Sequence, residues 1–203
     1  FDHVALAAGA GKPTVLELPN GLAHGVRTAS DFLMALQLTG AAKADSLANM
    51  QVRLPVVVVG GGLTAIDTAT ESLAYYPIQV EKFLQRYEAR VAEHGREAAW
   101  RIMGDRGDPA IAEAFLSHAH AIRSERDEAA TEGRPARIVP LLQSWGGATI
   151  AYRRLLVDSP SYTLNHEEIE KALEEGIRFA EGLTPLAVEV DALGRAAGLT
   201  VSV

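Results

Sequence analysis

The 203-residue sequence predicts an α/β fold with a parallel central sheet, a helical insertion and a terminal β-hairpin or meander. Three observations support this prediction. A run of β-branched residues at 54–59 ends in a glycine turn and passes into a helix, as in a strand covered on both faces of a parallel sheet. A second strand pattern follows only at 148–154, after a long stretch with helical periodicity. A buried strand at 177–179 and a hairpin pattern at 186–203 close the chain.

Composition limits the functions that the chain can have. Hydrophobic residues make up 48% of it and charged residues 22%, which suffices for a packed core. The formal net charge of -7 argues against nucleic acid as a partner, because that binding depends on clustered cations. No apolar run is long enough to cross a bilayer, so we expect a cytoplasmic protein without a membrane partner. Cysteine is absent, so electron chemistry would need a bound organic cofactor.

The first part of the chain predicts one strand and one helix. Phe1 to Ala8 is apolar and stops at a glycine-rich turn, which is typical of a short strand. A helix is expected from Asp31 to Leu38, capped by Thr28 or Ser30. Because the sequence starts inside a strand pattern and without methionine, we expect that it is part of a larger protein.

The middle of the chain predicts a helical excursion at residues 75–147. We expect the helix that follows the glycine turn to end at Pro77, because proline interrupts helical hydrogen bonding. Beyond it, apolar residues recur at helical spacing, and Asp108 followed by proline predicts the start of a second long helix. A third, shorter helix is expected at 135–145. Beyond the excursion, Asn165 can cap a helix at 166–175.

The segment VVVVGGGLTAID, residues 56–67, predicts a phosphate-binding turn. If the excursion is removed, the chain reads as strand, glycine turn, helix and the strand TIAYRR, which is a dinucleotide-binding βαβ unit with a lengthened crossover. Gly60 can form the tight turn, Gly62 lets a pyrophosphate approach the backbone, and Ala65 lets the helix lie close to the strand. Thr64 could add a hydroxyl contact. The alternative is a purely structural strand-to-helix turn.

Arg153 and Arg154 follow the second strand of this unit. Sites that prefer NAD usually carry an acid at this position, which accepts a hydrogen bond from the ribose 2'-hydroxyl. Two guanidinium groups instead offer forked donors that suit a 2'-phosphate. The sequence therefore predicts a preference for NADPH, and the alternative is a pair of solvated surface arginines.

A resemblance to a known family follows from these motifs in order. The segments FDHVALAAGAGKP, GVRTASDFLMAL, LPVVVVGGGLTAIDTATE and TIAYRR, followed by EIEKALEEGIRFAEGLTPLAVEVDALG, resemble the NAD(P)H-binding region of FAD-dependent pyridine nucleotide-disulfide oxidoreductases. The branch that looks most similar holds the glutamate synthase small subunit and the matching part of dihydropyrimidine dehydrogenase. The resemblance covers everything except the helical excursion, and it implies a Rossmann-like FAD/NAD(P)-binding domain.

The resemblance also implies a division of the chain and a set of site residues. Residues 1–50 would be a remnant of the FAD-domain strand and its connection, 51–74 and 148–203 the NAD(P)H-binding domain, and 75–147 the insertion. Ala8 and Gly9 match the family segment near the flavin. The residues implied to bind NADPH are Gly60, Gly61, Gly62, Leu63, Thr64, Ala65, Arg153 and Arg154.

The function implied is hydride transfer from NADPH to FAD within a larger flavoprotein, with an unseen electron acceptor. Such transfer depends on the orientation of the two cofactors, so no catalytic acid, base or metal is required of this chain. The amino-terminal glycine fingerprint for FAD and the later Gly-Asp segment are missing, so the isolated chain is not expected to hold FAD tightly or to be active alone. The alternative is an assembly module whose helical insertion docks another domain or subunit.

Overall fold

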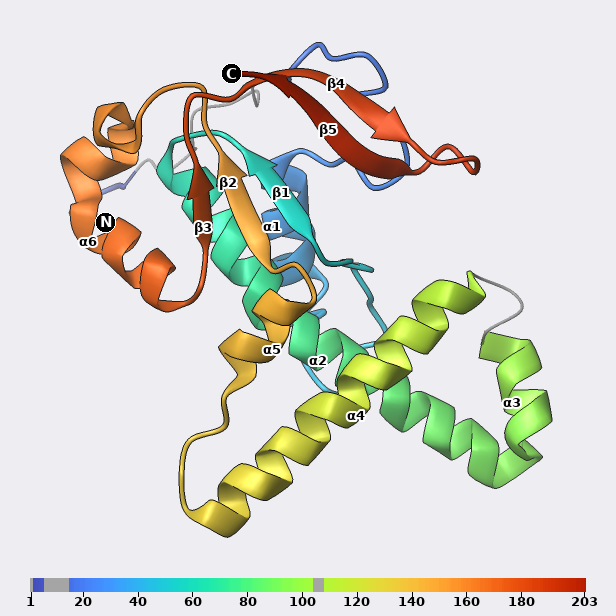
Figure 1. Ribbon diagram of the computed structural model, residues 1–203. Coiled ribbons are helices and arrows are strands. Elements are labelled where there is room, and N and C mark those ends of the chain that lie inside the picture. Colours follow the sequence, from blue (N-terminus) through green and yellow to red (C-terminus); the bar gives the residue numbers. More distant parts are fainter. Residues whose placement is uncertain (1, 6–14, 104–107) are drawn as a thin grey trace.

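A computed structural model describes residues 2–5, 15–103 and 108–203 and shows a mixed α/β arrangement (Figure 1). Strands and helices alternate around one short parallel sheet, and a separate hairpin follows it. The elements, in chain order, are α1 (Ala29–Leu38), β1 (Val56–Val59), α2 (Leu63–His94), α3 (Arg96–Met103), α4 (Pro109–Glu132), α5 (Ile138–Ser144), β2 (Ala148–Ala151), the 3-10 turn η1 (Leu156–Asp158), α6 (Pro160–Glu174), β3 (Arg178–Ala180), β4 (Thr184–Val190) and β5 (Ala196–Ser202).

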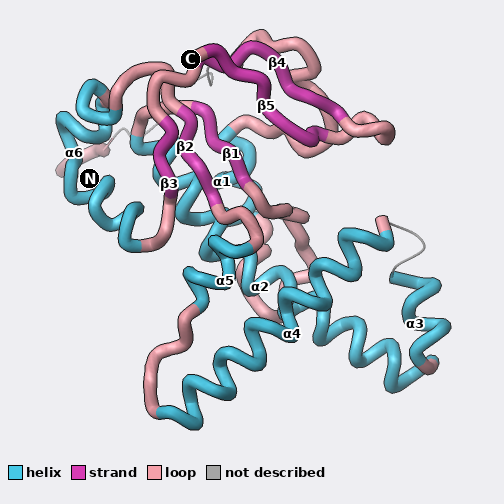
Figure 2. Tube along the Cα trace, in the orientation of Figure 1, coloured by secondary structure: helices cyan, strands magenta, loops and turns pink. Residues whose placement is uncertain are grey.

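The central sheet has the order β1-β2-β3, and both pairings are parallel. Val56 is opposite Ala148 and Val59 is opposite Ala151, so β1 and β2 start and end together. Figure 2 shows the three strands side by side, although helices α2 to α5 separate β1 from β2 in the sequence. This pairing confirms the prediction that the strand partner of the glycine turn lies beyond the helical excursion.

Helix α2 packs on β1 and β2 from one face of the sheet (Figure 1). Its small and apolar residues Ala65, Ile66 and Ala69 are buried there. On the other face, the side chain of Val57 remains 51% exposed. The expectation that β1 is covered on both faces is therefore wrong for the described residues, because they place α2 on one side of the strand and leave Val57 open on the other.

Helix α2 continues through Pro77, so the expectation that it ends there is also wrong. Proline removes one backbone N–H, but the buried face continues without a break from Leu73 and Tyr76 to Val80 and Leu84. Packing along this face outweighs the loss of one helical hydrogen bond. The helix therefore crosses the position at which we expected the excursion to begin.

The rest of the excursion is helical, as expected. Figure 1 shows α4 crossing the second half of α2, and the two helices pack on each other. Phe115 of α4 packs edge-on against both Tyr76 and Phe83 of α2. Trp100 of α3 packs in the same edge-on way on Tyr87 of α2.

The hairpin β4–β5 confirms the terminal hairpin prediction and is tied to residues 19–24. The Val188 N–H donates to the Pro19 carbonyl at 3.0 Å, and the Ala196 N–H donates to the His24 carbonyl at 2.9 Å. Arg195, in the hairpin turn, forms an ion pair with Asp108, which caps α4. The hairpin therefore contacts both the amino-terminal segment and the start of α4.

Two ends of elements differ from their predictions. Residues 2–5 form no strand and pair with none of the described strands; Phe1 and residues 6–8 lie outside the described part of the chain. Helix α6 starts at Pro160 rather than after Asn165, because the Ser159 hydroxyl caps it by accepting from the Tyr162 N–H at 3.1 Å. Asn165 instead marks a kink within α6.

Candidate functional site

The glycine turn joins the carboxyl end of β1 to the start of α2. Gly60 has a φ of 151°, which is in the range that L side chains rarely adopt. Its N–H donates to the Ala151 carbonyl at 3.1 Å, so the turn starts directly from the β1–β2 pairing. A Cβ at Gly60 would lie 3.4 Å from the methyl group of Ala65, which shows how closely the helix approaches the strand.

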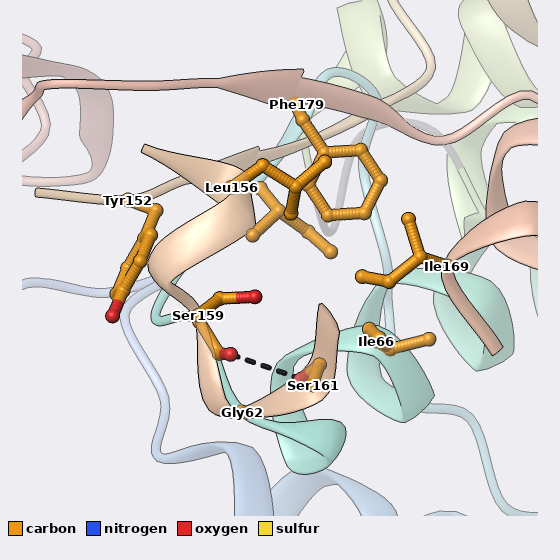
Figure 3. Close-up of a pocket in the computed structure, with 10 residues that line it drawn as sticks. Gly62, Ile66, Tyr152, Leu156, Ser159, Ser161, Ile169 and Phe179 are labelled. Carbon is orange, nitrogen blue, oxygen red and sulfur yellow. Dashed lines mark hydrogen bonds between the residues drawn. The ribbon is translucent and has the colours of Figure 1, made fainter. Parts of the chain in front are cut away.

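Gly61 is held between two side chains from beyond β2. Its carbonyl accepts from the Ser161 hydroxyl at 2.9 Å (the dashed line in Figure 3) and from the Ser161 N–H at 3.4 Å. A Cβ at Gly61 would lie 2.4 Å from a ring carbon of Tyr152, so only glycine fits beneath this ring. Because the C=O and N–H of a trans peptide point in opposite directions, the Gly62 N–H points away from Ser161.

Gly62 is the N-cap of α2, and a Cβ at this position would meet nothing within 4 Å. Among the described residues, none accepts a hydrogen bond from the N–H of Gly62, Leu63 or Thr64. The first turn of α2 holds no acidic residue, so its positive dipole end is not neutralised there. This side of the turn therefore offers open space and unpaired donors to an anion.

The inner side of the turn is closed. A small pocket of about 10 Å³ lies there, which is room for about one water. Its walls are mainly apolar and include Ile150. Figure 3 shows four further apolar side chains around it: Ile66, Leu156, Ile169 and Phe179. A dinucleotide cannot enter this space, so a ligand at the glycine turn has to lie on the open side, at Gly62.

Arg153 and Arg154 follow β2 and are exposed. Neither forms an ion pair with a carboxylate in the described ranges. Their backbone is nevertheless fixed: the Tyr152 carbonyl accepts from the Leu183 N–H at 2.9 Å, and the Arg154 carbonyl accepts from the Gly182 N–H at 3.3 Å. The backbone that carries the two guanidinium groups is thus fixed, while the groups themselves form no ion pair with the described residues.

The parallel pairing of β1 and β2 brings the glycine turn and the two arginines to one edge of the sheet. Tyr152 connects them, because its ring lies on Gly61 and its chain neighbour is Arg153. The structure thus brings together eight of the residues selected from the sequence: Gly60, Gly61, Gly62, Leu63, Thr64, Ala65, Arg153 and Arg154. Ala8 and Gly9, selected for the flavin side, lie outside the described residues.

Sequence reasoning missed Tyr152 and Ser161 as parts of this edge. The sequence Ser159-Pro160 carries a usable signal, because serine followed by proline is typical of the N-cap and first position of a helix. That signal would have predicted that α6 starts at Pro160, with Ser161 in its first turn. The position of the Tyr152 ring over Gly61 has no such local signal, since it depends on the pairing of strands far apart in the sequence.

Neither a metal site nor a membrane-spanning helix is found among the described residues. Within the described ranges, no group of three or more histidine, aspartate or glutamate side chains is placed to hold a metal ion. None of the helices in those ranges combines the length and the apolar character needed to cross a membrane.

Comparison with known proteins gives one relative. The chain is 42% identical to the uncharacterized protein RP006 of Rickettsia prowazekii (strain Madrid E). The match covers 100% of this chain but 26% of that protein, so the chain spans about a quarter of the length of the relative. No protein-family model matches the sequence.

Proposed function

We propose that this chain is the NADPH-binding module of a larger flavoprotein oxidoreductase, in which NADPH passes a hydride to FAD. The observation that carries the proposal is the parallel pairing of β1 with β2, because it brings the glycine turn and Arg153-Arg154 to the same edge of the sheet. In the proposal the sheet belongs to a Rossmann-like domain. The parallel order β1-β2-β3 supports this, because one half of such a sheet has three parallel strands in sequential order. Ligands of these sheets bind at the carboxyl ends of the strands, where the glycine turn lies.

In this proposal the pyrophosphate lies against the open side of the turn. The N–H groups of Gly62, Leu63 and Thr64 donate to it, and the absence of a side chain at Gly62 allows the close approach. Ser161 is a positioning residue, because it holds the Gly61 carbonyl and thereby directs the Gly62 N–H outward. Arg153 and Arg154 bind the 2'-phosphate of the adenosine.

The cofactors supply the redox chemistry, with NADPH as hydride donor and FAD of the full-length protein as acceptor. This chain contributes binding and orientation. The partners are then the FAD domain and an electron acceptor elsewhere in a cytoplasmic enzyme. Ala8 and Gly9, the residues expected near FAD, lie outside the described part of the chain, so no described residue is assigned to FAD.

A titration tests the proposal. NADPH should raise the melting temperature of the chain more than NADH does, because only NADPH carries the group that the arginines bind. The double variant Arg153→Ala/Arg154→Ala should weaken NADPH binding by at least about tenfold and leave NADH binding unchanged. The control is Arg96→Ala/Arg101→Ala, which removes two exposed arginines from α3.

Two results would count against it in different ways. If neither nucleotide changes the melting temperature at millimolar concentration, the cofactor site is refuted. If both bind equally and the Arg153→Ala/Arg154→Ala variant behaves as the parent does, only the 2'-phosphate assignment is refuted.

A second candidate function is an assembly module that docks another domain or subunit through the helical excursion. The observation in its favour is that α3, α4 and the second half of α2 extend away from the sheet (Figure 1). Ile102 at the end of α3 is 43% exposed on this arm. A chain that binds neither nucleotide, and whose longer natural form loses its assembly state when Ile102 is changed to glutamate, would favour this function.

A further inference from the structure

Two cations on the second half of α2 face the irregular segment at residues 41–49. Lys82 is buried, with 7% of its surface exposed, and its Nζ donates to the carbonyls of Ala41 and Lys43, both at 2.9 Å. Arg86 follows one helical turn later and is half-buried, and its Nη2 donates to the Ser46 carbonyl at 2.7 Å. Both side chains thus bind main-chain oxygens of the same segment.

In the described part of the chain, no acidic side chain pairs directly with either of these cations. Within the described ranges, no carboxylate lies within 4.0 Å of either side chain. The arginines Arg123 and Arg195, by contrast, each contact a carboxylate directly. Asp45 acts on Lys82 only through space. Burial, and secondarily the charge of Arg86, lowers the pKa of Lys82, and the charge of Asp45 opposes this shift only in part.

A cavity of about 110 Å³ lies beside the two cations. This is room for several waters or for a small ion, whereas the pocket at the glycine turn has room for about one water. Asn49, Tyr75, Phe83 and Met103 complete its wall. Arg86 has five N–H donors, and one of them is used by Ser46 among the described residues, so its guanidinium group has donors left for a ligand.

We propose that this cavity binds the oxyanion group, carboxylate or phosphate, of a small molecule. Arg86 supplies the hydrogen bonds, since its planar fork matches two oxygens of such a group. Lys82 supplies positive charge, while its own hydrogens stay on the carbonyls of Ala41 and Lys43. Along α2 the two cations lie roughly 30 to 36 Å from Gly62, at 1.5 Å per residue, so the site is separate from the proposed nucleotide site.

The test uses the whole chain and two probes, inorganic phosphate and acetate, at constant ionic strength maintained with chloride. In a nitrogen-15 NMR titration, at least one probe should shift the Arg86 Nε–H resonance with a Kd in the millimolar range or tighter. The preference between the two probes then shows whether the natural ligand carries a phosphate or a carboxylate. If neither probe shifts this resonance, the proposal is overturned.

Variants separate this site from the others. Arg86→Gln, checked for folding by circular dichroism, should weaken binding of the effective probe by at least about tenfold, as followed in parent and variant by the backbone amide resonance of Asn49 in the cavity wall. The matched control is Arg90→Gln, one turn further along α2 and exposed, which should bind as the parent does. Arg153→Ala/Arg154→Ala should also keep the Arg86 shift, so failure at either site is recognised independently. Unchanged binding in Arg86→Gln would refute the role of Arg86.

Discussion

The two halves of α2 differ in the side chains with which they pack. The first half, residues 63–77, meets the sheet and α6 through small side chains such as Ala65, Ala69 and Ser72, which allow close approach. The second half, residues 78–94, uses long side chains. Gln79, Lys82 and Arg86 reach the backbone of the segment that precedes β1, while aromatic residues pack on α3 and α4.

This difference shows why one helix can serve both a regular sheet and an irregular segment. The strands of a sheet pair their backbone groups with one another, so the helix that covers the sheet needs only apolar side chains of complementary shape. A segment without regular structure leaves N–H and C=O groups unpaired, and the second half of α2 supplies side chains that pair with them. Each half can therefore be disrupted by a different kind of substitution.

The largest effect is expected at Gln79. Its amide pairs with both backbone groups of buried Val52: Oε1 accepts from the N–H and Nε2 donates to the carbonyl, each at 2.7 Å. Gln79→Ala should lower the free energy of unfolding by about 3 kcal/mol, because two buried backbone groups lose their partner. Chemical denaturation measures this. Gln85→Ala, exposed on the same helix, is the control, and an equal loss in both variants would contradict the role of Gln79.

A smaller effect is expected at Gly61, beside the first half of α2. A Cβ here would lie within 2.4 to 2.6 Å of three ring carbons of Tyr152. Gly61→Ala should therefore cost about 1 to 3 kcal/mol of unfolding free energy, since the ring or the turn has to move. Gly62→Ala should cost little, because its Cβ would meet nothing within 4 Å.

A double-mutant cycle decides whether the ring is the cause of the Gly61 effect. In a Tyr152→Ala background, Gly61→Ala should lose most of its cost, since the colliding atoms are gone. Denaturation curves of the four proteins give the coupling free energy. Additive losses would mean that the glycine is required by the backbone and not by Tyr152.

The stability of the contacts around Tyr76, where the two halves of α2 meet, should depend on pH. The Tyr76 hydroxyl lies 2.6 Å from His118 Nδ1, and the His118 ring stacks on Trp145 with centroids 3.8 Å apart. Burial lowers the pKa of His118 from its ordinary value of 6.5. The unfolded chain therefore binds the proton more readily, and stability falls as the pH drops through 6.5 toward the folded value.

The measurement is the melting temperature across this range for the parent and for His118→Gln. The two proteins differ only at residue 118, so the difference between the two curves isolates His118. The parent should lose more stability than the variant as the pH falls. Parallel curves would show that His118 does not titrate in this range or that its burial has no energetic consequence.

Local sequence signals predicted much of this fold. The β-branched run, the glycines and the short pattern TIAYRR were sufficient to predict that β1 pairs with β2 across the excursion. The patterns at 186–203 predicted the hairpin. What could not be predicted depends on contacts between distant residues. Pro77 reads locally as a helix end, yet packing of Tyr76 and Val80 continues the helix.

The same limit applies to side chains at the candidate sites. His118 reads as a surface residue at helical spacing, yet it is half-buried because α5 brings Trp145 against it. Lys82 reads as one of several charges on a solvated helix face, and only the path of residues 41–49 makes it a buried cation. The position of Arg153 and Arg154 after β2 was predictable from the sequence, because it depends only on where one short strand ends.

The smallest effect is expected where α2 and α4 meet at the surface. Arg123 of α4 donates to both carboxylate oxygens of Glu88, at 2.7 and 3.1 Å, and both side chains are about half exposed. The hydrogen bond from Arg123 lowers the pKa of Glu88. Arg123→Ala should cost at most about 1 kcal/mol of unfolding free energy, because water and salt screen such pairs. Denaturation at low and high salt measures it, and the difference from the parent should shrink as salt is added. A loss as large as that of Gln79→Ala, or one insensitive to salt, would mean that the second half of α2 depends on surface ion pairs as much as on buried hydrogen bonds.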